Sequence, residues 1–174
     1  NGTVIDGEII AYQLDQPLGF NVLQSRIGRK NVSKSILDKA PVVMIAYDLL
    51  ERNGKDIRES PLHYRRQELE KLVKQGASEK LLISEVVQFN EWEDLIKERA
   101  DSRIYHAEGL MLKSKFGTYK VGRKKGDWWK WKIDPLTIDA VLLYAMRGHG
   151  RRANLYTDYT FAVWKGNELV PFAK

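Results

Sequence analysis

Two lysines, Lys130 and Lys132, stand two positions apart in the stretch WWKWK, which covers residues 128 to 132. In a β-strand this spacing puts both ammonium groups on one face and the indoles of Trp129 and Trp131 on the other. Two parallel cations suit a phosphate chain, because each one can neutralise negative charge that develops on it. The spacing therefore predicts a phosphate-binding strand whose indole face packs or stacks.

Three other short stretches place a polar or aromatic group on a strand in the same way. DGE gives Glu8, IAYD gives Tyr47 and EGLMLK gives Glu108. Two carboxylates from separate strands suit a divalent cation that bridges phosphates, and an aromatic face suits a purine ring. Each stretch alone has an ordinary explanation as a turn, a core residue or a solvated edge. Together they predict a site for a nucleotide and a metal ion.

Positive charge is concentrated around these lysines. Residues 113 to 132 contain eight lysines and arginines and one acid, Asp127, so this window has a net charge of +7 in a chain whose total is +6. Such a patch suits phosphate or nucleic acid. A lysine-rich pair of strands that is basic for solubility would explain the charge equally well, but not the tryptophans.

The composition excludes several classes of protein. The 174 residues are 43% hydrophobic, which is typical of a globular chain with one core and room for a small second unit. There is no cysteine, which excludes disulfides and thiolate metal sites. No apolar run approaches the roughly 20 residues of a membrane span, so we expect no membrane partner. No charged-then-apolar leader suggests secretion, and the lack of cysteine permits a reducing compartment, so we expect a cytoplasmic location.

The hydrophobic pattern predicts the elements that position these residues. Strands are expected within residues 2–15, 42–57, 80–89, 107–115 and 127–133 and beyond Pro135, with hairpin turns at Asn53-Gly54 and Gly166-Asn167. Helices are expected over residues 59–76, capped by Ser60, and 90–101, capped by Asn90. In the first strand one face is small and apolar and belongs in the core. That face comprises Ile5, Gly7, Ile9 and Ala11.

The four stretches occur in an order that resembles the motifs of the covalent nucleotidyltransferases, and among them of the ATP-dependent DNA ligases. DGEIIAY resembles the third motif, PVVMIAYDLLERNGKD the aromatic motif that follows, EGLMLK the fourth and WWKWKIDP the fifth. The stretch from Trp128 to Trp164 is similar to a bacterial group of these ligases. The resemblance implies that the chain acts with ATP and Mg²⁺ on nicked double-stranded DNA.

The resemblance also implies roles for single residues. Glu8 would contact the ribose and help to organise the metal, and Tyr47 would stack on adenine. Glu108 would be the main carboxylate at the Mg²⁺ ion, and Lys130 and Lys132 would contact the α-phosphate. Further contacts to phosphate or to the DNA backbone are expected from Lys113, Arg123, Lys124 and Lys125.

The implied fold is of the α/β (α+β) class, with two mostly antiparallel sheets and flanking helices around the nucleotide. Residues 1–134 would form a partial adenylation domain, and residues 135–174 the first strands of an oligonucleotide-binding (OB) barrel. The family's K-x-D-G motif, whose lysine becomes adenylated, is absent: the one Asp-Gly pair is Asp6-Gly7, with no lysine before it. We therefore expect a ligase fragment that is inactive by itself. We also expect an open sheet edge that allows self-association, and no obligate protein partner.

Two alternatives remain open. An RNA ligase or an mRNA-capping guanylyltransferase shares the same motifs. A noncatalytic, basic β domain that binds nucleic acid would use the basic patch for phosphates and Trp128, Trp129 or Trp131 for bases. The second alternative does not explain Glu8 and Glu108, because carboxylates on a surface that binds a polyanion are unfavourable without a metal.

Overall fold

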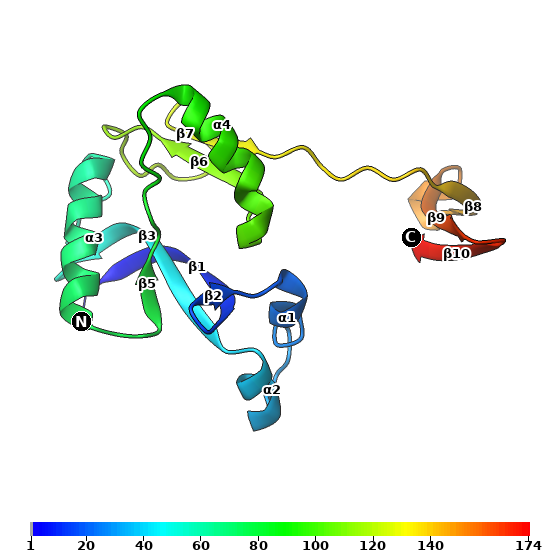
Figure 1. Cartoon of the computed structure of the whole chain (residues 1–174), viewed down its shortest axis with the longest axis horizontal. Helices are drawn as coiled ribbons and strands as arrows, with labels where there is room; N and C mark the ends of the chain where they lie inside the picture. Colours follow the sequence, from blue (N-terminus) through cyan, green and yellow to red (C-terminus); the bar gives the residue numbers. More distant parts are fainter. Residues whose placement is uncertain (1) are drawn as a thin grey trace. The chain divides into compact units, whose positions relative to one another are not determined.

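The computed structural model describes residues 2–174 and divides into two compact units, residues 1–133 and 134–174 (Figure 1). The fold is mixed α and β with mostly antiparallel sheets, which confirms the predicted class. Within the described residues no helix is long and apolar enough to cross a membrane.

The main sheet of the larger unit has the strand order β2-β1-β3-β4, with β5 paired to β3. Its strands are β1 (Val4–Gln13), β2 (Gln16–Pro17), β3 (Val42–Arg52), β4 (Lys55–Asp56) and β5 (Leu81–Ile83). Only the pairing of β3 with β5 is parallel. The predicted turn between β3 and β4 is confirmed, since Asn53 and Gly54 both have positive φ angles, of 52° and 78°.

Helix α3 (Leu62–Gly76) packs on one face of this sheet (Figure 1). The core there is formed by Ala46, Leu49, Ile57 and Leu69, with Ile5 packed against it. The predicted cap of α3 was wrong: the helix begins after Pro61 without a side-chain cap. The carbonyl oxygen of Ser60 instead accepts a hydrogen bond from Arg65. Two short helices, α1 (Phe20–Gln24) and α2 (Lys34–Lys39), lie between β2 and β3 in the chain.

A second, two-stranded sheet pairs β6 (Gly109–Lys113) with β7 (Trp128–Lys132). Helix α4 (Trp92–Asp101) lies beside it and is followed by the short helix η1 (Ser102–Tyr105) (Figure 1). Glu91, not Asn90, caps α4, through a reciprocal capping box with Asp94. The strand predicted over residues 80–89 is shorter, because residues 84–90 form no ladder.

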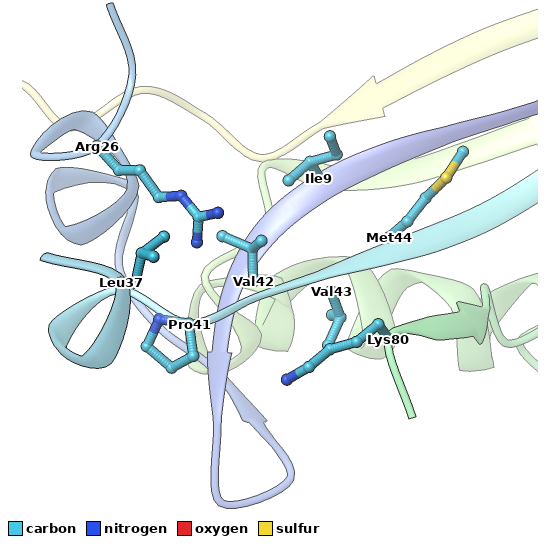
Figure 2. Close-up of a pocket in the computed structure, with 8 residues that line it drawn as sticks. All are labelled: Ile9, Arg26, Leu37, Pro41, Val42, Val43, Met44 and Lys80. Carbon is cyan, nitrogen blue, oxygen red and sulfur yellow. The ribbon is translucent and has the colours of Figure 1, made fainter. Parts of the chain in front are cut away.

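One predicted core residue of β1 is not in the core. Ala11 is buried and Ile5 is half-buried, whereas Ile9 is 58% exposed. Figure 2 shows why: Ile9 borders an open hollow of about 450 Å³ that no described residue fills. The hollow is lined by Ile9, Arg26, Leu37, Pro41, Val42, Val43, Met44 and Lys80. Strand alternation fixes the face of the sheet on which Ile9 lies, but not how far α3 extends to cover it.

The smaller unit is a three-stranded antiparallel sheet in the order β10-β9-β8. Its elements are β8 (Val141–Arg147), η2 (Gly150–Arg152), β9 (Tyr156–Lys165) and β10 (Glu168–Ala173). The predicted turn at Gly166-Asn167 is confirmed, and Gly166 has the positive φ (63°) that the turn requires. In this unit as described, only Thr160 and Ala162 are buried.

Candidate active site

The face of the two-stranded sheet that displays the lysines is set by its register. Met111 pairs with Lys130 and Lys113 pairs with Trp128, and paired residues share a face. On the opposite face Leu112 pairs with Trp129, and both residues line a second hollow together with Trp92 of α4. The alternation predicted for WWKWK is therefore confirmed, with lysines on one face and two indoles on the other.

Glu108 reaches the lysine face directly. Its Oε2 atom accepts a hydrogen bond of 2.5 Å from Nζ of Lys132, and both side chains are mostly exposed. This hydrogen bond, with the nearby positive charge of Lys132 and Lys130, holds the pKa of Glu108 below its usual range. Gly109 makes the geometry possible: its φ is 136°, and a Cβ atom there would lie 2.2 Å from the carbonyl oxygen of Trp131.

Lys113 lies between two aromatic rings. Its ammonium is 4.3 Å from the ring centre of Tyr47 and 3.9 Å from that of Trp128, which are cation–π distances. Burial lowers the pKa of Lys113, and the carboxylates of Asp48 and Asp6 partly oppose this shift. Through Lys113 the strand pair β6–β7 contacts the main sheet at Tyr47.

Two tyrosine hydroxyls donate to the carboxylate of Asp6. Tyr47 donates to Oδ1 at 3.1 Å and Tyr119 donates to Oδ2 at 2.6 Å. The pKa of Tyr47 is raised to about 12, first by burial and then by the charge of Asp6; the pKa of Tyr119 is also raised to about 12, chiefly by its hydrogen bond to Asp6. Glu8 is exposed, and its charge contributes to the shift of Tyr47, which places it near that ring.

A fully buried ion pair lies beneath these groups. Arg65 donates from Nε and Nη2 to the two carboxylate oxygens of Asp48, at 2.8 and 2.9 Å, and neither side chain is exposed. Arg65 also donates to the carbonyl oxygen of Gly117 at 3.2 Å. The pair therefore ties β3 to the loop that carries Tyr119.

Sequence reasoning missed Asp48, Arg65 and Tyr119. A signal existed for Arg65, because it continues the apolar stripe of α3 at helical spacing, three positions after Leu62 and four before Leu69. An arginine within such a stripe requires a buried acidic partner. Tyr119 had a weaker signal, as one of two aromatic residues in an otherwise basic loop.

The loop between β6 and β7 presents the remaining basic residues. Its ends are joined by a hydrogen bond from the amide of Ser114 to the carbonyl oxygen of Asp127, and an ion pair of Lys120 with Asp127 ties the middle of the loop to its end. Arg123, Lys124 and Lys125 are all exposed. None of the three forms an ion pair with any residue that the structure describes. They are therefore available to an external polyanion.

The lysine face can accommodate a ligand with an aromatic end and an anionic end. Because a strand rises about 3.3 Å per residue, Lys130 lies about 7 Å and Lys132 about 13 Å along β7 from Trp128. Aromatic rings are thus at one end of this line, the ammonium of Lys130 is near its middle, and Lys132 with Glu108 is at the other end. Residues 2–174 contain no cluster of three acidic or histidine side chains that could hold a metal ion alone. A magnesium ion there would have to be shared with phosphates, since this ion often binds through one or two carboxylates plus phosphate oxygens.

Comparison with known proteins identifies the family. Residues 1–132 match the family model described as "ATP dependent DNA ligase domain". A probable DNA ligase of Koribacter versatilis is 35% identical over 98% of this chain and 33% of its own length. A DNA ligase of Pyrobaculum calidifontis is 31% identical over 92% of this chain and 28% of its own length. The chain thus spans about a third of the length of these curated relatives.

Solved structures agree on the fold. A structure described as "mycobacterial DNA ligase D complexed with ATP and MES" superimposes with a TM-score of 0.57 at 23% identity, over 97% of this chain and 48% of that one. A structure from a study of Lig E DNA ligases, described as "DNA binding with a minimal scaffold", gives 0.69 at 17% identity, over 97% and 60%. With the family match over residues 1–132, these findings show that the chain belongs to the ATP-dependent DNA ligase family.

Proposed function

We propose that residues 1–133 form most of the ATP site of an enzyme that seals nicks in double-stranded DNA. The observation that supports this most directly is the lysine face of β6–β7, with aromatic rings at one end, Lys130 midway, and Glu108 with Lys132 at the other end. Its length of about 13 Å suits a nucleotide that extends from base to phosphates.

At the base end, adenine stacks on the ring of Tyr47. Lys113 occupies one face of this ring, so the base takes the other face. Glu8 contacts the ribose hydroxyl from the same strand as Asp6. Lys113 remains beside the nucleotide as a partly buried cation, where its charge favours an anionic ligand.

At the phosphate end, Lys130 and Lys132 contact the α-phosphate and stabilise the charge that develops on it. Mg²⁺, shared between the phosphates and Glu108 with help from Glu8, would neutralise phosphate charge. In the structure Glu108 accepts a hydrogen bond from Lys132. A cation bound at this carboxylate would replace that bond and leave the lysine available to phosphate.

Nicked DNA is contacted outside the nucleotide site. Arg123, Lys124 and Lys125 provide exposed cations for the DNA backbone. We assign residues 135–174 as the start of an OB domain, on the basis of their three antiparallel strands. Sealing in this family proceeds through a lysine–AMP adduct, then a DNA–adenylate, and ends with attack of the 3′-hydroxyl and release of AMP. Because the K-x-D-G motif is not in these residues, we expect no adduct on this chain alone.

Calorimetric titration of the 174-residue chain with MgATP tests the nucleotide site. We expect binding in the parent chain and strong weakening when Lys130 and Lys132 are both changed to alanine. The double variant Lys71→Ala/Lys74→Ala, which removes the same charge from two exposed positions of α3, serves as the control and should leave binding unchanged. Labelled ATP should give no acid-stable adduct.

Binding of nucleic acid distinguishes the alternatives. If MgATP does not bind while DNA binds with a steep salt dependence, the chain is a noncatalytic nucleic-acid-binding domain. An enzyme comprising this chain and the K-x-D-G motif should seal nicked DNA. Preference for nicked RNA, or transfer of GMP to an RNA end, would instead indicate an RNA ligase or a capping enzyme.

A further inference from the structure

We propose that Tyr119 is a positioning residue of the nucleotide site, which acts through Asp6 on the ring of Tyr47. The hydroxyl of Tyr119 donates to one oxygen of Asp6 at 2.6 Å, and the hydroxyl of Tyr47 donates to the other at 3.1 Å. The two tyrosines therefore share one carboxylate. This inference rests on the proposed role of Tyr47 in stacking on adenine.

Tyr47 needs such a support because of where it lies in β3. Asp6 pairs with Asp48, and Gly7 pairs with Ala46, so Tyr47 is the extra residue of a β-bulge. A bulged residue has no directly opposed cross-strand partner to orient its side chain. Two contacts therefore orient the ring of Tyr47. Its hydroxyl donates a hydrogen bond to Asp6, and the ammonium of Lys113 lies against one face of the ring.

Tyr119 is itself held firmly enough to act as the fixed point. Its backbone amide donates to the carbonyl oxygen of Arg58 at 2.8 Å. Its ring meets Trp128 edge-on at 5.6 Å between ring centres, and the guanidinium of Arg65 lies 5.9 Å from the ring centre. Asp6 is 113 positions away in the chain, so this bond joins the loop before β7 to the first strand. Tyr119 thereby couples the orientation of the base-stacking ring to the strand that carries the phosphate-binding lysines.

The variant Tyr119→Phe removes only the hydroxyl and keeps the ring against Trp128. We expect MgATP to bind the variant chain about 2- to 12-fold more weakly, the net size of one typical hydrogen bond. In a Tyr47→Phe background, which has already lost the link to Asp6, the same change should cost little further affinity. A purely structural role of Tyr119 predicts instead equal losses in both backgrounds, and that result would overturn the proposal. Tyr105→Phe, at an exposed tyrosine, is the matched control and should leave affinity unchanged.

A second measurement does not depend on nucleotide binding. The ε-methylene protons of Lys113 should be shifted upfield in NMR spectra, because two rings lie within 4.3 Å of its ammonium. Tyr119→Phe should reduce this shift as the ring of Tyr47 loses its fixed orientation, and Tyr105→Phe should not. Absence of MgATP binding by the parent chain would disprove the proposed function alone. An unchanged Lys113 shift in Tyr119→Phe would disprove the positioning role.

Discussion

Replacing Arg65 by methionine should remove a large part of the stability of the larger unit. The guanidinium of Arg65 is fully buried and neutralises Asp48 through two hydrogen bonds of 2.8 and 2.9 Å. Methionine preserves much of the side-chain volume but leaves the Asp48 carboxylate buried and unpaired. Breaking a buried pair in this way costs about 3–5 kcal/mol, a large part of the roughly 5–15 kcal/mol by which domains of this size are stable.

Urea unfolding followed by tryptophan fluorescence measures this loss. A Trp164→Phe background removes the tryptophan of the smaller unit, so that the signal reports the larger unit alone. If the variant with Arg65 replaced does not fold, the double variant Asp48→Leu/Arg65→Met still tests the reasoning. It removes both charges and should be more stable than the single variant, because no unpaired charge remains. Lys71→Met, at a side chain that is 62% exposed, is the control and should change stability little.

Two outcomes would refute this reasoning. The first is a loss below about 1 kcal/mol for Arg65→Met, which would mean that water or another group compensates Asp48. The second is a double variant no more stable than the single one, which would mean that Arg65 acts through packing or through its bond to Gly117 rather than through charge.

Three further predictions concern the site. Gly109→Ala should abolish MgATP binding measured by calorimetry, since its Cβ atom would strike backbone of the facing strand, whereas Gly76→Ala, with open space around it, should not. Changing residues 123–125 to glutamine should lower the slope of log Kd against log salt for nicked DNA, measured by fluorescence anisotropy, by up to about 0.9 per lost phosphate contact. The pKa values of Tyr47 and Tyr119 are raised to about 12, so the folded chain retains protons that the unfolded chain loses near pH 10. Stability in urea should therefore fall between pH 10 and 12, and less steeply when both tyrosines are phenylalanine.

Local patterns were sufficient to predict much of the fold. Alternation placed Lys130 and Lys132 on one face of β7, and the Asn-Gly pair at residues 53–54 located a hairpin turn, because each feature depends on neighbouring residues only. The caps of both long helices were wrong, since several polar residues precede each helix and tertiary contacts decide which one caps it. Ser60, for example, supplies its carbonyl to Arg65 instead of capping α3.

The contacts that complete the site could not be predicted in the same way. The bond between Asp6 and Tyr119 joins residues 113 positions apart, and it depends on a bulge in β3 that no local pattern indicates. The position of Lys113 of β6 between two rings likewise requires the β6–β7 pair to meet β3. Sequence reasoning could list the lysines, Glu8, Tyr47 and Glu108 but not Tyr119, and the distances between these groups depend on how the two sheets pack.

The glycines of DGE and EGLMLK show how a short motif can combine a packing requirement with a chemical one. A Cβ atom on Gly7 would lie 2.6 Å from the carbonyl oxygen of Ile45, and one on Gly109 would lie 2.2 Å from that of Trp131. In both places, therefore, the facing strand approaches more closely than any other residue would allow. The acidic residue just before each glycine then reaches a side chain of that facing strand. Asp6 accepts a hydrogen bond from Tyr47, and Glu108 accepts one from Lys132. The acid-glycine pair is thus one structural device used twice, once at the base end and once at the phosphate end of the proposed nucleotide site.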